Sequence, residues 1–442
     1  MNQPLHGRAA LPAGFTAQVA AWMDERLDRA PVGRTVPPTT MSALLEGSIS
    51  ATGLGVEEAW RRYLEHVEPN TVGLDSERYL AFIPVAPAAA GVWMEAMVGA
   101  ATFSAESWLE AAGVVAAENQ TLRWLADLFG LPQEAGGCFM SGGSIGNLSA
   151  LAVAREAGGE RRTVVIGDTA HASVGNSLRL LGLDDVVVVP TGADGRLTAT
   201  AAAAALDGRH ASIIVAAGGS TNAGVVDDLA GLADLADEHD AWLHVDGAYG
   251  LAAMLLDEKR PLFDGIERAD SLIIDPHKWL FAPQGSCALL YRDPASAAAV
   301  HTQHGPYIDV LHVDDSWNPS DYGYQLTRRA TGLPLWFMLA AHGTDALAAA
   351  VRVGIDLAAA AADALERVDD VSLVMRPELG VVLFRRAGWG RTEWRSWARR
   401  LLEEGTAFVA PSTWKGEPVG RLVFMHPRTP PGIVDELVAS LV

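Results

Sequence analysis

The chain has 442 residues, of which 49% are hydrophobic and 20% are charged, so it can bury a large core and is not intrinsically disordered. Its 33 basic and 54 acidic side chains give a formal net charge of −21, which argues against a nucleic-acid-binding protein and against docking on anionic lipid. Two cysteines, Cys138 and Cys287, cannot form a disulfide framework and favour a reducing compartment.

The first residues, MNQPLHGRAALPAGF, lack the basic and long apolar regions of a secretory signal. No stretch approaches ~20 apolar residues without a charge or a glycine, so no membrane span is predicted. We therefore expect a cytoplasmic protein with neither a nucleic-acid nor a membrane partner, and we predict no metal site.

The N-terminal part is predicted to be an arm, assigned to residues 1–90. Residues 1–45 are rich in proline and glycine and predict an extended segment that leads into a short helix. Residues 56–66 have an amphipathic pattern, and residues 104–130 predict a long helix that ends at a glycine.

Between residues 160 and 295, short apolar runs alternate with helical stretches. Nearly continuous β-branched runs are typical of strands covered on both faces, and the intervening helices indicate βαβ units with a mostly parallel sheet. The predicted strands are residues 163–167, 186–190, 212–216, 242–246, 271–275 and 287–291. These strands define a large α/β domain, which we assign to residues 91–344.

The pattern changes again near residue 345, where a smaller α+β domain, residues 345–442, is predicted. Its elements are a helix over 344–367, strands over 371–375 and 380–385, a helix over 392–404 and a strand over 421–425.

A glycine-rich turn runs directly into a predicted helix at FMSGGSIGNLSAL, residues 139–151. The backbone N–H groups of Gly142 and Gly143 and the hydroxyl of Ser144 can point at an anion, which the helix dipole also favours. The spacing matches neither G-x-G-x-x-G nor a Walker loop, so a dinucleotide or nucleoside-triphosphate site is not predicted. Taken alone, such a turn is more often purely structural.

Polar side chains follow three of the predicted strands. Asp246 ends WLHVD, His277 and Lys278 follow SLIID, and His171 lies just beyond TVVIG. Asp246 is either a cap or salt-bridge partner, or a carboxylate held against a protonated heterocyclic nitrogen. Burial should lower the pKa of Lys278 and make its amine nucleophilic enough for Schiff-base chemistry, unless the side chain reaches the surface beside Trp279. His171 alone would be a hydrogen-bonding histidine.

Together these four features predict a cofactor. Ligands of open α/β sheets bind beyond the carboxyl ends of the strands, where all four features lie. Pyridoxal 5′-phosphate (PLP) requires a helix N-terminus for its phosphate, a carboxylate such as Asp246 for its ring nitrogen and a lysine such as Lys278 for its aldehyde. The sequence therefore predicts a PLP-dependent enzyme.

The segments SGGSIGNL, AHASV, GSTNAGVVDD, WLHVDGAYG and DPHKWL follow one another along the chain. In these segments, and in HPRTP near residue 426, the chain resembles the group II PLP-dependent amino-acid decarboxylases, which include the aromatic-L-amino-acid, histidine and glutamate decarboxylases. The resemblance runs from about Tyr79 to the C-terminus. It implies the fold-type I, aminotransferase-like α/β architecture and a homodimer in which residues 1–90 contribute to dimerisation.

The resemblance also implies roles for individual residues. Lys278 would bind the cofactor covalently, Asp246 would contact the ring nitrogen and His171 would stack on the ring. Further residues are implied to hold the phosphate, the ring or its hydroxyl, and they are Gly143, Ser144, His277, Thr221 and Ala248.

The chain departs from the family in the loop 305–327. The family's loop carries a tyrosine that protonates the product carbon, but the matching position falls near residues 317–319, where there is no tyrosine. Tyr322 is our first candidate for this acid, and Tyr324 and His171 are the alternatives. The polar stretch HVDDSWNPSDYGYQ is longer than an ordinary connection and is typical of a functional lid.

The predicted reaction is α-decarboxylation of an L-amino acid to an amine and CO2. The candidate substrate-binding residues are apolar and favour an aromatic or bulky aliphatic side chain; they are Phe82, Ile83, Val85 and Trp108. No arginine lies near them in sequence to bind an acidic side chain, and Val85 stands where the aromatic-acid members have a hydroxyl residue. Alternatives are a PLP-dependent aldehyde synthase, a retro-aldol carbon–carbon lyase, and a non-enzymatic binding protein, against which the intact reactive residues argue.

Overall fold

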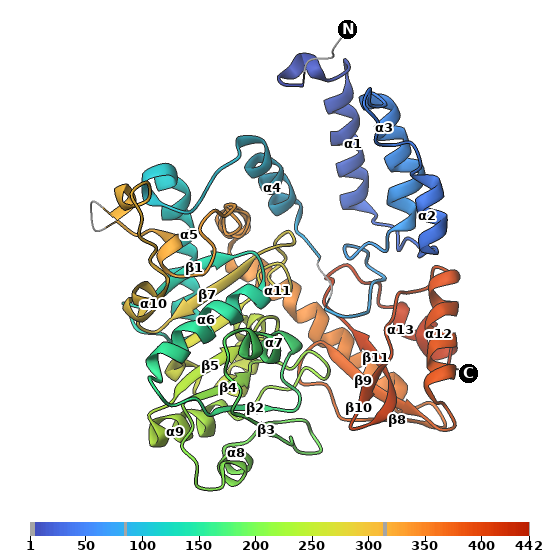
Figure 1. The fold of residues 1–442 in the computed structure, drawn as a ribbon. Coiled ribbons are helices and arrows are strands. Elements are labelled where there is room, and N and C mark those ends of the chain that lie inside the picture. The colour runs from blue at the N-terminus through green and yellow to red at the C-terminus, as the bar shows by residue number, and fades with distance from the viewer. Residues whose placement is uncertain (1–4, 84–85, 313–315, 442) are drawn as a thin grey trace.

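The computed structural model describes residues 5–83, 86–312 and 316–441. The described chain forms a helical N-terminal arm, a large α/β domain with a seven-stranded sheet and a small C-terminal domain with a four-stranded sheet (Figure 1).

The large sheet has the strand order β1-β7-β6-β5-β4-β2-β3. The pairs from β3 through β6 are parallel, whereas β7 is antiparallel to both of its neighbours, so the prediction of a mostly parallel sheet is confirmed. Sequence reasoning missed one strand of this sheet, β1, and in the small domain it missed β10. The strands are β1 (Gly136–Met140), β2 (Val164–Gly167), β3 (Val186–Val189), β4 (Ile213–Ala217), β5 (Trp242–Asp246), β6 (Ser271–Ile274) and β7 (Cys287–Tyr291).

Helices cover both faces of this sheet, which explains why its strands are apolar without in–out alternation. The helices of the domain are α4 (Ala89–Ala101), α5 (Trp108–Leu128), α6 (Gly143–Ala157), α7 (Ala172–Leu180), α8 (Ala199–Leu206), α9 (Leu229–His239) and α10 (Pro294–His301). Side chains of α5, α8 and α9 form the core against one face, and those of α6, α7 and α10 pack on the other. The polar carboxyl ends of β4, β5 and β6 therefore meet at one edge of the sheet.

Close backbone contact brings two of these strand ends together. A Cβ atom on Gly250, in the turn after β5, would lie 2.1 Å from the carbonyl oxygen of Gly218, which follows β4. Only glycine fits at this position. The WLHVDGAYG motif thus encodes a tight approach between the segments that carry Asp246 and Thr221.

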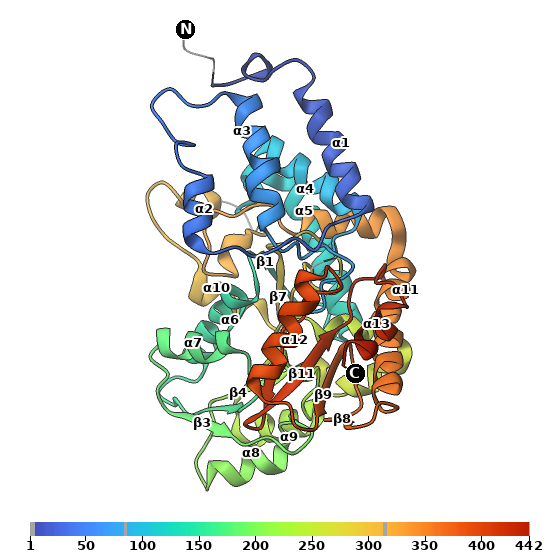
Figure 2. The same ribbon diagram turned by 90° about the vertical axis from the view of Figure 1, so that its right-hand side faces the viewer.

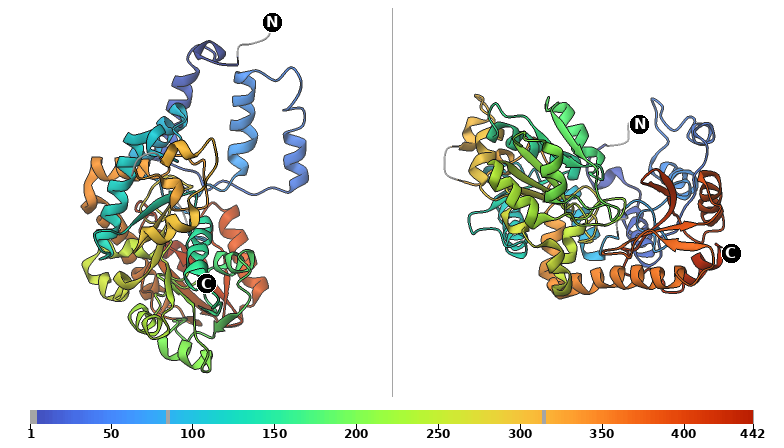
Figure 3. Two further views of the ribbon diagram at one scale, coloured as in Figure 1. Left: turned by 60° about the vertical axis from the view of Figure 1, so that its left-hand side comes forward. Right: turned by 90° about the horizontal axis from the view of Figure 1, so that it is seen from below.

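A long bent helix, α11 (Leu333–Leu365), joins the two domains and runs along the small one (Figure 3). It breaks at Gly343, whose φ of 74° and ψ of 173° are not helical. The small sheet is antiparallel with the order β10-β11-β9-β8 (Figure 2). The other elements of this domain are β8 (Val371–Leu373), β9 (Val381–Arg386), α12 (Arg391–Glu403), β10 (Ser412–Trp414), β11 (Glu417–Val423) and α13 (Ile433–Ala439).

The arm contains three helices that stand apart from the sheets (Figure 1), namely α1 (Phe15–Asp28), α2 (Pro38–Leu44) and α3 (Val56–Arg62). The prediction of an extended segment before one short helix is therefore wrong. The rings of Phe15 and Trp22 pack edge-on against Trp60, with centroids 5.8 and 5.9 Å apart, and these contacts stabilise α1. Proline and glycine on both sides of α1 hide its helical period in the sequence.

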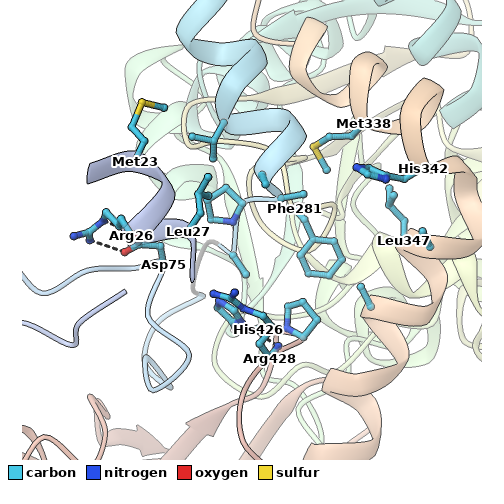
Figure 4. Close-up of a pocket in the computed structure, with 18 of the residues that line it drawn as sticks. Met23, Arg26, Leu27, Asp75, Phe281, Met338, His342, Leu347, His426 and Arg428 are labelled. Carbon is cyan, nitrogen blue, oxygen red and sulfur yellow. Dashed lines mark hydrogen bonds and ion pairs between the residues drawn. The ribbon is translucent and has the colours of Figure 1, made fainter. Parts of the chain in front are cut away.

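The end of α1 faces the large domain across a cavity of about 500 Å³ (Figure 4). At this end of α1, Arg26 pairs with Asp75 and Glu68 of the same arm at 2.7 and 2.9 Å. Leu27, Phe281 and Met338 contribute apolar walls. No helix in the described part of the chain is long and apolar enough to cross a bilayer.

Candidate active site

Two cavities meet beside Lys278 and His171, at the edge where β4, β5 and β6 end. One, of about 360 Å³, is lined by the start of α6, by Asp246 and by the segment after β6. The other, of about 650 Å³, lies between Phe82, the start of α7 and the small domain. The structure therefore brings together the polar motifs that sequence reasoning placed at strand ends, although they are more than 130 residues apart along the chain in some cases.

Asp246 is fixed by two hydrogen bonds. Its Oδ2 accepts a hydrogen bond from Asn147 Nδ2 at 3.0 Å, and its Oδ1 accepts one from the backbone N–H of Ala248 at 3.2 Å. Both donors hold the carboxylate in one orientation. Asp246 is 9% exposed and lines the cavity, so the carboxylate can still receive a proton donor such as a pyridinium N–H.

Lys278 follows β6 and is mostly buried, with its Nζ 3.0 Å from Asp275 Oδ2. Burial by itself lowers the pKa of this amine, but the carboxylates of Asp275 and Asp246 outweigh burial and raise the pKa above its ordinary value. The predicted lowering is wrong because DPHK places a carboxylate within hydrogen-bonding reach of the lysine. Asp275 Oδ2 pairs with the lysine, while the buried Asp275 Oδ1 has no hydrogen-bond partner in the described chain.

The glycine-rich turn forms an anion cradle. The backbone N–H groups of Gly143 and Ser144 start α6 and make no hydrogen bond to the rest of the described chain, and both residues line the smaller cavity. A Cβ on Gly143 would lie 2.9 Å from Asp275 Oδ2, so glycine is required here. His277 lines the same cavity, and its Nδ1 contacts the carbonyl oxygen of Ser286, to which it can donate.

His171 caps the start of α7 and lines both cavities. Its Nδ1 lies 2.7 Å from Ser173 Oγ and accepts the backbone N–H of Ser173 at 3.2 Å. Thr221 and Ala248 also line the pocket around Lys278. The described structure thus collects all eight residues implied to hold the cofactor, with an anion cradle at one end, a carboxylate at the other and an amine between them.

The candidate substrate residues divide into two groups. Phe82 and Ile83 line the larger cavity, whereas Val85 lies outside the described residues. Trp108 does not line the cavity. It is 37% exposed at the start of α5, where its backbone N–H donates to Asn318 Oδ1 at 3.0 Å. Tyr322 does not reach it within this chain either, because its ring stacks on Trp317 with centroids 4.0 Å apart.

Sequence reasoning missed the contribution of the small domain. The hairpin of β10 and β11 carries Trp414 and Lys415 to the rim of the larger cavity, where Lys415 pairs with Asp168 at 3.2 Å. Arg421 is 4% exposed, and its Nη2 donates to the carbonyl oxygens of Thr221 and Phe82 at 2.6 and 2.8 Å. The fold thus brings an arginine to the candidate substrate residues, although none lies near them along the chain. The available signal was an arginine within an otherwise apolar strand.

The fold and this site define the chain as a PLP-dependent enzyme of the fold-type I class. The model of the pyridoxal-dependent decarboxylase conserved domain matches residues 38–387. The chain belongs to the pyridoxal-dependent decarboxylase family.

Known relatives agree with this assignment over most of their length. The chain is 30% identical to an aromatic-L-amino-acid decarboxylase of Bacillus atrophaeus, covering 90% of this chain and 87% of that protein. It is 32% identical to an L-2,4-diaminobutyrate decarboxylase of Rhizobium meliloti, covering 87% and 80%. The fold matches that of Oryza sativa TDC, solved with PLP and tryptamine, with a TM-score of 0.90, 24% identity and full coverage of both chains.

The residues present fit PLP. The unpaired N–H groups of Gly143 and Ser144 would bind its phosphate, Asp246 would hold the proton on its ring nitrogen and Lys278 would bond to its aldehyde carbon. PLP bound in this way supplies an electron sink that accepts the electron pair of a bond broken at the substrate's Cα.

Proposed function

We propose that this protein converts an L-amino acid with an aromatic or bulky apolar side chain into its amine and CO2. The observation that carries the proposal is the arrangement around Lys278, where the amine, the Asp246 carboxylate and the anion cradle share one pocket with an apolar wall. The 30% identity to an aromatic-L-amino-acid decarboxylase over nearly the whole chain supports the substrate class.

The residues of the site divide the work of the reaction. The ion pair of Lys278 Nζ with Asp275 Oδ2, 3.0 Å apart, holds the amine in the pocket, where it would bond to the aldehyde carbon of PLP. Asp246 would hold the proton on the ring nitrogen of bound PLP. His171 lines the pocket beside Lys278 and would lie against the cofactor.

A proton must finally reach Cα, and we place its source in the loop 305–327. Tyr322 keeps its proton at neutral pH, because burial, aided by Asp321, raises the pKa of its phenol to about 12. Within one chain its ring lies on Trp317 rather than in the pocket, whereas Tyr324 is 69% exposed. Loop movement, or entry into the site of a second copy, would bring one of these phenols to the substrate.

Arg421 favours a second substrate class, the acidic amino acids. Its guanidinium donates to backbone carbonyls, which are neutral, so its positive charge has no carboxylate partner among those contacts. A side-chain carboxylate in the larger cavity would complete such a site. A second product class is an aldehyde, since the fold also matches the 4-hydroxyphenylacetaldehyde synthase of Rhodiola rosea with a TM-score of 0.86 at 21% identity.

We also infer that the active form is a cytoplasmic homodimer. Helix α4 is apolar except for Glu95, yet Trp93 and Met97 on it and Leu109 at the start of α5 are 36, 49 and 66% exposed. A second copy would cover this surface. Light scattering of the PLP-loaded protein should give twice the monomer mass, and Met97→Glu should lower it, while Val188→Glu, on an exposed strand of the large sheet, should not. A monomer that is fully active would contradict the inference.

The proposed reaction is tested by incubating the PLP-loaded protein with the twenty common L-amino acids and L-2,4-diaminobutyrate. CO2, amine, aldehyde and peroxide are measured together. We expect CO2 and amine in equal amounts from an aromatic substrate. CO2 release only from glutamate or aspartate, lost in Arg421→Met, would establish the acidic class instead, and aldehyde with peroxide would establish the synthase.

A further inference from the structure

A line of buried polar side chains runs along β5 beneath α6. Trp242, His244 and Asp246 occupy alternate positions of β5 and therefore point to the same face of the sheet. Ser271 pairs with His244 across the β5–β6 ladder, and Asn147 projects from α6, four residues after Gly143. Polar groups in a core are costly unless each finds a partner, so this line needs an explanation.

Consecutive members of the line contact one another at hydrogen-bonding distance. Trp242 Nε1 lies 2.8 Å from Ser271 Oγ, and the same oxygen lies 2.8 Å from His244 Nδ1. His244 Nε2 is 2.9 Å from Asn147 Oδ1. Asn147 Nδ2 then donates to Asp246 Oδ2 at 3.0 Å and to Ser173 Oγ at 3.0 Å.

The chemistry of the groups gives these contacts a single direction. The ionised carboxylate of Asp246 can only accept, so the nitrogen of the Asn147 amide faces it and the amide oxygen faces His244 Nε2. Burial holds the pKa of His244 down at about 4, so the ring is neutral and its one proton lies on Nε2, where it meets this oxygen. His244 Nδ1 then accepts the hydroxyl proton of Ser271, whose oxygen accepts the indole N–H of Trp242.

The same direction continues to the pocket. Since Ser173 Oγ accepts from Asn147, its hydroxyl proton points to His171 Nδ1 at 2.7 Å. The backbone N–H of Ser173 donates to that nitrogen as well. His171 Nδ1 is thus an acceptor, and the ring proton lies on Nε2.

We propose that His244 and Asn147 are positioning residues, which orient the Asp246 carboxylate toward the cofactor nitrogen and set the Nε2–H tautomer of His171. The relay, defined as Trp242, Ser271, His244, Asn147 and Ser173, connects Asp246 to His171, and both of these side chains line the smaller cavity. The experiments that measure turnover rest on the proposed function. The effect of the relay on the ring nitrogen does not, because it can be measured without substrate.

The relay acts by excluding the wrong orientation of one amide. Without the His244 Nε2–H, the Asn147 amide is free to turn its oxygen toward Asp246 Oδ2, which places two acceptors in contact. The carboxylate then moves or loses its charge, and the pyridinium loses its partner. Loss of a hydrogen bond to a charged group corresponds to about a 10- to 100-fold change in an equilibrium or rate.

The direct test is the ¹⁵N chemical shift of the ring nitrogen in protein loaded with ¹⁵N-labelled PLP, without substrate. The parent should show a protonated nitrogen at neutral pH. Asn147→Leu and Asn147→Asp should both shift the signal toward the unprotonated position and weaken PLP binding about 10-fold or more. Asn147→Asp retains the shape of the side chain and an acceptor for His244, so it provides the same test if Asn147→Leu does not fold.

His244 is tested by graded replacement. His244→Leu should shift the ring-nitrogen signal and lower kcat about 10-fold or more with little change in KM. His244→Gln, whose amide can donate to Asn147, should restore most of the parent signal and most of the parent kcat. The matched control is His301→Leu, at another buried histidine, whose Nε2 donates to the carbonyl oxygen of Ser149 at 3.1 Å, outside the relay. It should leave the ring-nitrogen signal unchanged.

The two proposals fail in different ways. If the Asn147 and His244 variants all keep the parent ¹⁵N signal and PLP affinity, the relay is overturned, whatever the enzyme does with substrate. If the signals respond as expected but no amino acid releases CO2, the proposed function fails and the relay stands. A ¹⁵N-histidine spectrum that shows His171 protonated on Nδ1 would also overturn the relay.

Discussion

Glu118→Gln is expected to destabilise the protein by breaking a buried ion pair. Glu118 in α5 and Arg328, which follows the loop 305–327, are 1% and 3% exposed. The carboxylate also accepts the N–H of Gly332 at 2.9 Å. Glutamine retains the shape but leaves the guanidinium charge buried without a counter-charge. Removing one partner of such a pair costs about 3–5 kcal/mol of unfolding free energy.

A neighbouring ion pair provides the control. Arg329 pairs with Glu95 of α4, but its side chain is 57% exposed, so Glu95→Gln should cost only about 0–1 kcal/mol. Both variants are unfolded in urea with PLP bound, and tryptophan fluorescence is recorded. With a denaturant dependence of ~3 kcal/mol per molar, Glu118→Gln should lower the midpoint by ~1 M or more.

The double variant Glu118→Leu, Arg328→Met removes both charges and should recover much of the loss, because the main cost is the unpaired buried charge rather than the absence of the pair. Equal small shifts for Glu118→Gln and Glu95→Gln would refute the reasoning. A double variant less stable than Glu118→Gln would show instead that the pair itself supplies the stability.

Further predictions concern the site and its pH dependence. Borohydride reduction of the PLP-loaded protein should place the pyridoxyl group on Lys278, and peptide mapping that finds it on another lysine would be contrary to the site. Asp246→Asn should fold and bind PLP but turn over at least ~10-fold more slowly, since each lost pKa unit at the ring nitrogen is worth about 1.4 kcal/mol; near-parent kcat would rule out the role. Tyr322→Phe or Tyr324→Phe should lower amine formation and raise the aldehyde fraction without changing PLP affinity. If both variants keep the product ratio of the parent, the proton donor is His171 instead. Burial, aided by Arg428, lowers the pKa of His426 to about 4, so the folded state prefers the neutral ring. The stability that this preference contributes to the folded state is present above pH ~6.5 and is lost as the pH falls toward 4, by up to ~3 kcal/mol of unfolding free energy. In His426→Asn the urea midpoint should therefore fall less steeply between these two pH values.

The parts of the fold that sequence predicted are those that local pattern encodes. Each β-branched run between residues 163 and 291 became a strand, because a strand buried on both faces requires a run of this kind. The strand β1 was missed because GGCFM carries two glycines, and glycine is unfavourable in isolated strands. Helix α1 was missed because its stability comes from contact with Trp60, some forty residues away.

The cofactor site was predictable for a similar reason. Each of its parts is a short motif at the end of one strand or the start of one helix, and parallel strands bring such ends to one edge. The residues that modify these parts were not predictable, because they come from elsewhere. Arg421 and Trp414 enter from the small domain, and Asn147 and His244 contact each other across 97 residues of chain.

The sequence by itself determined the class of enzyme, its family and its cofactor, since these depend on backbone shape and side-chain type within single motifs. Only the tertiary structure decided the charge environment. It showed that Asp275 and Asp246 raise the pKa of Lys278 where burial alone would lower it, that Arg421 lines the larger cavity beside Lys278, and that Tyr322 lies on Trp317. Coulomb energies vary with distance and burial, and both are properties of the packed molecule rather than of any one segment.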